Sequence, residues 1–133
     1  MGETLTYIEL ETVVSMLNDI YWESKTLHWT ATDYGDHLLY DRIAEGIFDN
    51  IDEIMEGAFI PFYNLPLENS ILAKTLRDNA TPQKLVDLLE NAIEFIEKCL
   101  KNNDVLEAVK NILSNVSSEL LVKQMLLRKN LQK

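Results

Sequence analysis

The sequence contains very little cysteine, proline or glycine. Cys99 is the single cysteine in 133 residues, which excludes an intrachain disulfide and a zinc site built on clustered thiolates. No apolar run approaches the roughly 20 residues that a membrane-spanning helix needs. Residues 1–6 carry no basic residue of the kind that opens a secretion signal. These absences predict one soluble, cytoplasmic, strongly helical domain over residues 1–133.

Positive charge is also scarce. The chain has 12 Lys and Arg against 22 Asp and Glu, a formal net charge of −10. A surplus of negative charge opposes binding to the phosphates of nucleic acid, and residues 1–7 supply no basic arm. We therefore expect cations as partners, with no nucleic acid and no membrane.

Apolar residues recur every three or four positions in four segments, which is the spacing of helices that bury one face. The expected helices run from a cap at Thr6 to about Thr30, from about Asp36 to Phe59 or Phe62, from a cap at Thr81 to about Leu100, and from a cap at Asp104 to about Leu131. Residues 64–80 allow either a short connecting helix or an ordered crossover. One long connection between the second and third helices predicts an all-α, ferritin-like four-helix bundle.

The two histidines of the chain flank the first short turn. His28 is near the end of the first helix and His37 is at the start of the second, so a short turn between antiparallel helices should bring them together. Asp41 follows His37 at the i, i+4 spacing of one helix face. Two imidazoles and one carboxylate form a ligand set that suits non-haem iron with open coordination positions.

Asp52 and Glu56 repeat the i, i+4 spacing with two carboxylates. In a continuous helix they share one face with His37 and Asp41, but the rise of about 1.5 Å per residue separates the two pairs by roughly 16 Å. One chain cannot bring both pairs to one ion. If two copies of the second helix cross antiparallel about a two-fold axis, the acids of one copy lie beside the His37 and Asp41 of the other.

The order His28-Trp29, His37-x-x-x-Asp41 and Asp52-x-x-x-Glu56 resembles the ferroxidase signature of the Dps family. This resemblance implies that His28, His37 and Asp41 on one side, with Asp52 and Glu56 on the other, bind iron(II) at a site between subunits. It also implies oxidation by hydrogen peroxide or oxygen and storage of the mineral in a hollow shell of twelve subunits.

Other interpretations of these residues remain open. Trp29 is a candidate electron donor to a reactive oxidant, although a tryptophan at a helix end more often packs. Imidazole and carboxylate ligands also suit zinc or manganese, and a helical-bundle interaction protein without turnover is a further alternative. Met125 and Cys99 are predicted to pack in the core. The sequence leaves open whether dimers close into a shell.

Overall fold

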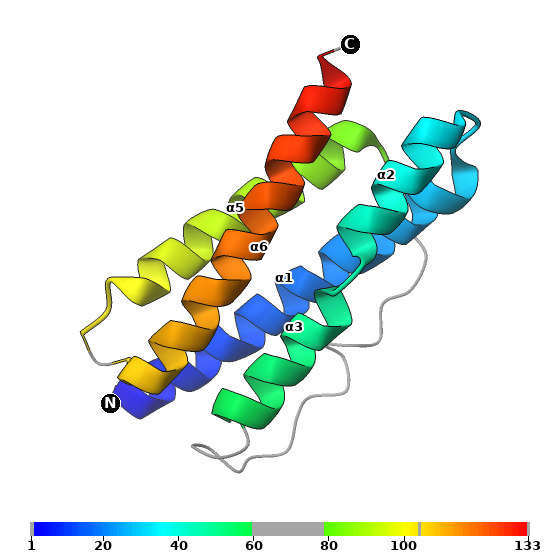
Figure 1. Cartoon of the computed structure of the whole chain (residues 1–133). Helices are drawn as coiled ribbons and strands as arrows, with labels where there is room; N and C mark the ends of the chain where they lie inside the picture. Colours follow the sequence, from blue (N-terminus) through cyan, green and yellow to red (C-terminus); the bar gives the residue numbers. More distant parts are fainter. Residues whose placement is uncertain (1, 60–78, 104, 133) are drawn as a thin grey trace.

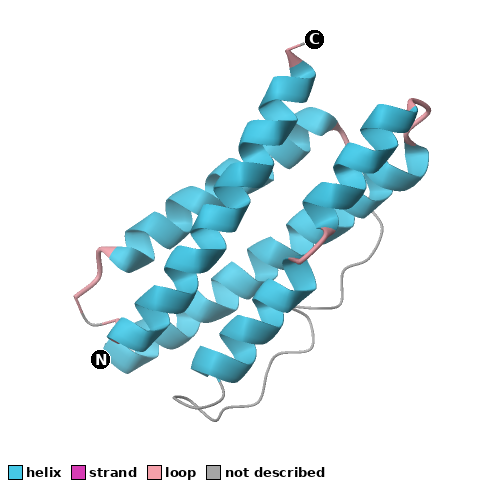
Figure 2. Ribbon diagram, viewed as in Figure 1, coloured by secondary structure: helices cyan, strands magenta, loops and turns pink. Residues whose placement is uncertain are grey.

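The computed structural model describes residues 2–59, 79–103 and 105–132, with side chains from residue 9 onward and up to residue 58 in the first range. These ranges contain helices and loops and no strand (Figure 2). The helical elements, shown in Figure 1, are α1 (Gly2–Thr30), α2 (Tyr34–Ala44), α3 (Ile47–Ile54), a π-helical turn over Met55–Phe59, α5 (Pro82–Leu100) and α6 (Glu107–Leu131). The predicted all-α four-helix bundle is confirmed. The prediction for residues 64–80 lies almost entirely outside the described residues.

Two hydrogen bonds define the direction of the helices. The Thr81 backbone N–H, just before α5, donates to Oε2 of Glu23 near the end of α1, at 3.0 Å. Near the end of α6, the Asn130 side-chain amide donates to Oδ1 of Asp36 at the start of α2, at 3.1 Å. The α2–α3 segment and α5 therefore run parallel to each other and antiparallel to α1 and α6 (Figure 1). The connection between α3 and α5 accordingly joins opposite ends of the bundle, as in bundles with one long crossover.

The cap expected at Thr81 is confirmed, whereas the start expected at Thr6 was wrong because α1 already begins at Gly2. The Thr81 hydroxyl accepts from the Lys84 backbone N–H at 3.1 Å, with Pro82 as the first helical residue. Asp33 caps α2 by accepting from the backbone N–H of Asp36 at 3.0 Å. The fourth helix starts later than expected, because Leu106 occupies the cap position of α6 and no side chain caps it. Asp104, the predicted cap, lies outside the described residues.

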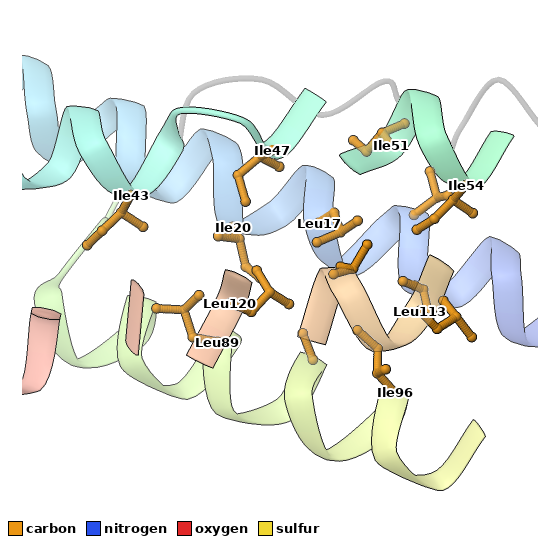
Figure 3. Close-up of a cluster of buried hydrophobic side chains, with 14 of the residues drawn as sticks. Leu17, Ile20, Ile43, Ile47, Ile51, Ile54, Leu89, Ile96, Leu113 and Leu120 are labelled. Atoms are coloured by element: carbon orange, nitrogen blue, oxygen red, sulfur yellow. The ribbon is translucent and has the colours of Figure 1, made fainter. Parts of the chain in front are cut away.

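The core is formed by branched aliphatic side chains from every helix (Figure 3). Full burial of each contributes about 1.5–3 kcal/mol relative to exposure. The buried set includes Leu17, Ile20, Ile43, Ile47, Ile54, Leu89, Ile96, Leu113 and Leu120. Cys99 is buried as predicted, but Met125 is 62% exposed, so its assignment to the core was wrong. The buried face of α6 includes Gln124 and Leu127. Met125, the residue after Gln124, is turned by about 100° around the helix axis from it.

The second predicted helix is broken, which corrects the expectation of one continuous helix to Phe59. Glu45 leaves the helical conformation at ψ 133°, and Gly46 follows at φ 83°, the left-handed region that glycine tolerates best. The prediction that Asp41 and Asp52 share one helix face assumed an uninterrupted helix. Because the helix is broken between them, the helical spacing no longer supports that prediction.

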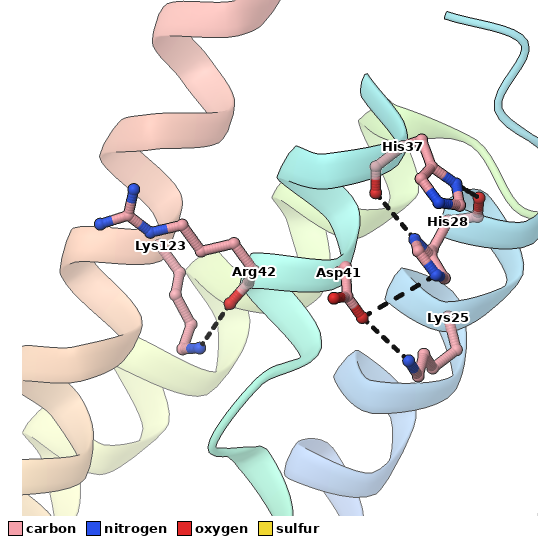
Figure 4. A network of polar contacts seen from close by, with 6 residues as sticks. All are labelled: Lys25, His28, His37, Asp41, Arg42 and Lys123. Carbon is pink, nitrogen blue, oxygen red and sulfur yellow. Dashed lines mark hydrogen bonds and ion pairs between the residues drawn. The ribbon is translucent and has the colours of Figure 1, made fainter. Parts of the chain in front are cut away.

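A lysine from α6 stabilises this break. Lys123 Nζ donates to the main-chain oxygens of Arg42, Ile43 and Glu45 at 3.2, 2.9 and 2.5 Å (Figure 4 shows the Arg42 contact). The last carbonyls of a helix have no partner within the helix, and here an ammonium group supplies one.

Candidate metal site

His28 and His37 face each other across the turn between α1 and α2. Their rings stack with centroids 3.9 Å apart and planes 24° apart (Figure 4). The turn is short because α1 ends at Thr30 and Asp33 already caps α2. The predicted proximity of the two histidines is therefore present within a single chain.

Each imidazole is held by the backbone of the other histidine. Nδ1 of His28 lies 2.7 Å from the main-chain oxygen of His37, and Nδ1 of His37 lies 2.8 Å from that of His28. A carbonyl oxygen only accepts hydrogen bonds, so both Nδ1 atoms carry the hydrogen. In neutral imidazole the lone pair then lies on Nε2, and metal-binding histidines are commonly oriented by such a hydrogen bond. The pair thus presents two nitrogens with a defined tautomer.

Asp41 adds a carboxylate beside this pair. Its Oδ1 lies 3.9 Å from Nε2 of His28 and 3.0 Å from Nζ of Lys25 (Figure 4). The hydrogen bond from Lys25 is the main cause that holds the pKa of Asp41 below its ordinary value. Burial, the next largest effect, acts in the opposite direction, and the charges of Lys25, His28 and His37 add to the lowering. The Asp41 side chain is 51% exposed and so remains accessible to a ligand.

Lys25 is a part of this cluster that the sequence reasoning missed. Its ammonium group occupies the position beside Asp41 that a cation would take, and it also lies 5.6 Å from the centre of the Trp29 ring. Residues 25, 28 and 29 are spaced i, i+3 and i+4 on α1, which places them on one helix face. That spacing predicts from sequence alone that Lys25 lies on the same helix face as His28.

Asp52 and Glu56 lie beyond the break. Asp52 is exposed on α3, and Glu56 is exposed on the π-helical turn. In the described part of one chain, no group of three or more His, Cys, Asp and Glu side chains converges closely enough to hold a metal ion. The structure thus brings His28, His37 and Asp41 near one another and leaves the two acids apart from them. Sharing of a site between two copies remains a prediction.

The aromatic residues around the cluster are largely exposed. Trp29 is 54% exposed, with its ring centre 6.4 Å from that of His28, and Tyr34 is 73% exposed, with its ring centre 6.3 Å from that of His37. Phe48, at 43% exposure, stacks on Tyr21 with centroids 3.9 Å apart. Trp29 therefore does not pack in the core, which was the alternative to a role at the site.

Comparisons of the chain with protein-family models, with curated proteins and with solved structures find no match. The resemblance to the Dps family accordingly depends on the residue pattern of the first two predicted helices. Within the described ranges, no helix is both long and apolar enough to span a membrane.

Proposed function

We propose that this chain is a ferritin-like, Dps-type ferroxidase that oxidises iron(II) at sites shared between two copies. The observation that carries the proposal is the reciprocal locking of His28 and His37. Each Nδ1 atom donates a hydrogen bond to a main-chain carbonyl. The Nε2 atoms of the two stacked imidazoles are therefore available as metal ligands. With Asp41 they match the two-nitrogen, one-carboxylate preference of non-haem iron.

The remaining ligands would come from a second copy. Asp52 and Glu56 are exposed and therefore available to a neighbouring chain. A two-fold axis makes such sharing reciprocal, so that each dimer holds two equivalent sites. Because the helix is broken at Glu45 and Gly46, the way in which α3 would present these acids to a second copy depends on that break rather than on one straight helix.

The proposed reaction consumes iron(II) as its substrate. Hydrogen peroxide accepts two electrons, one from each of two iron(II) ions, and with two protons leaves as two molecules of water. Carboxylates stabilise the more highly charged iron(III), which favours this direction. When only one iron(II) is bound, Trp29 is a candidate source of the second electron because its ring lies next to that of His28. By resemblance, the product would be stored as mineral in a shell of twelve subunits.

Lys25 sets a condition on iron binding. Its ammonium group is hydrogen-bonded to Asp41, so iron(II) must displace it to reach Oδ1. An incoming cation and the lysine compete for one carboxylate, which weakens binding to a protein that carries this lysine. Lys25→Ala is therefore expected to bind iron(II) more tightly than the wild type, as followed by anaerobic titration.

Complementation between two inactive variants tests the sharing directly. His37→Ala removes one half of each site and Asp52→Ala removes the other, so each variant alone should lose rapid peroxide-driven oxidation. When the two are unfolded together and refolded at equal amounts, half of the dimers are mixed, and each mixed dimer regains one intact site of two. Activity should return to about a quarter of the wild-type value.

The matched control is Glu94→Ala, which removes an exposed acid from α5 and should oxidise iron(II) at the wild-type rate. An unchanged rate in either single variant contradicts the proposed ligands. Two inactive variants that fail to recover activity when mixed, although light scattering shows dimers, contradict the sharing.

A second candidate is a bundle that holds zinc or manganese, or mediates interactions, without turnover. The observation in its favour is that the two stacked imidazoles and the Asp41 carboxylate beside them do not by themselves select iron over zinc or manganese. Elemental analysis of protein purified without added metal separates the cases, because zinc or manganese in place of iron favours this candidate. Light scattering on the iron-loaded protein tests the shell, since a dimer alone cannot store mineral.

A further inference from the structure

The exposed side of the second helix is acidic around its break. Residues 43–59 include five acidic residues and no Lys or Arg, and the acids are all exposed: Glu45, Asp49, Asp52, Glu53 and Glu56. Glu45 and Asp49 line both the groove that faces α6 and the hollow that faces α1, so they lie on the crest between the two. A second copy that covers this side must cover these two carboxylates.

The cations near this surface do not neutralise it. Lys25 is hydrogen-bonded to Asp41 at 3.0 Å, and Lys123 is held by main-chain carbonyls at the break. Arg42 adds one exposed positive charge at the end of α2, against the five exposed acids. Because like charges repel and salt screens them only in part, two such surfaces repel each other when no further cation lies between them.

The pairing proposed above brings these two surfaces together. If Asp52 of one copy lies beside Asp41 of the other, the two-fold axis passes close to the midpoint between these positions, which is the break at Glu45 and Gly46. Glu45 and Asp49 of both copies then lie near the axis, so four carboxylates approach one another. A dimer without bound cations is therefore opposed by charge.

One chain offers iron(II) only part of the proposed ligand set. Within the described ranges of a single chain, no three His, Cys, Asp and Glu side chains are arranged to hold a metal ion. Asp52 and Glu56 would have to come from a second copy. A ligand that binds one state more tightly shifts the equilibrium towards that state, and the coupling is reciprocal.

We infer that iron(II) controls assembly: two copies pair when it binds and separate when it is removed. The inference rests on the shared site proposed above. The divalent charge offsets the repulsion between the carboxylates near the axis, and the second copy completes the ligand set. The affinity for iron(II) should accordingly rise with protein concentration.

Anaerobic titration with iron(II), followed by sedimentation velocity, tests this inference on the full chain. Protein treated with a chelator should sediment as a monomer, and iron(II) should shift it to a dimer or to a multiple of the dimer. Excess chelator should reverse the shift. A dimer that persists unchanged in excess chelator overturns the inference, and so does a monomer that persists in saturating iron(II).

Two variants of equal charge separate ligation from repulsion. Asp49→Asn and Asp52→Asn each remove one exposed carboxylate from α3, but only Asp52 is a proposed ligand. Asp52→Asn should raise the iron(II) concentration at the midpoint of dimerisation by about tenfold or more. Asp49→Asn should lower that midpoint relative to Glu94→Gln, which removes an exposed acid from α5. Equal midpoints in the two α3 variants overturn the inference.

Sedimentation and oxidation are separate readouts, so the two proposals can fail separately. Pairing that depends on iron(II), without rapid oxidation by peroxide, supports this inference and contradicts the ferroxidase. Rapid oxidation by a dimer that persists in chelator contradicts this inference and leaves the ferroxidase standing.

Discussion

Replacing Lys123 by methionine isolates the interaction that stabilises the broken second helix. Methionine is apolar and of similar length, so it keeps the packing of the lysine stem on α6 and removes the ammonium group. Three main-chain oxygens, those of Arg42, Ile43 and Glu45, then lose their donor. Burial lowers the pKa of Lys123, although the charges of Glu119 and Glu45 raise it in part.

The expected loss can be worked out from these contacts. A hydrogen bond from a charged group contributes about 1.5–3 kcal/mol, but the contacts to Arg42 and Glu45 are exposed, so water replaces the lysine there. Removing the ammonium group also relieves its own desolvation. The part-buried contact to Ile43 therefore dominates, and the net loss in the free energy of unfolding is about 2 kcal/mol. For a chain of this size that lowers Tm by roughly 6–10 °C.

Thermal and urea unfolding, followed by circular dichroism, measure this loss. Lys129→Met is the matched control, since Lys129 is exposed on the same helix, and it should change the free energy of unfolding by less than about 0.5 kcal/mol. If Lys123→Met costs no more than Lys129→Met, the break does not depend on the lysine and the reasoning is refuted.

Three further outcomes are expected. Gly46→Ala should cost about 1–2 kcal/mol of unfolding free energy from backbone strain alone, since no atom lies within 4 Å of the added Cβ; unchanged urea unfolding would contradict this. Lys25→Ala should raise the pKa of Asp41 towards its ordinary value of 3.8 in an NMR titration, and should reduce the stability that the wild type loses as pH falls below that value; an unchanged titration would count against the pair. Because burial raises the pKa of Cys99 to about 12, the native thiol should resist alkylation at pH 8 and stability should fall as pH rises above 9.0; rapid labelling of folded protein would disprove its burial.

The sequence by itself determined those features that depend on neighbours along the chain. The cap at Thr81, with Pro82 as the first helical residue, is local, so residue type and order along the chain predict it. The approach of His28 to His37 is also local, because a short turn between antiparallel helices places the end of the first beside the start of the second. The all-α class is likewise determined by apolar periodicity.

Only the tertiary structure decided where the second helix breaks and which contacts surround Asp41. Ile43 and Ile47 keep the helical i, i+4 spacing across Gly46, so periodicity alone predicts a continuous helix. The carbonyls released by the break are satisfied by Lys123, a residue distant in sequence that only packing of α6 brings near. Met125 is exposed for a related reason. Its neighbour Gln124 is buried, and only the packing of the other helices decides which of two adjacent positions on α6 faces the core.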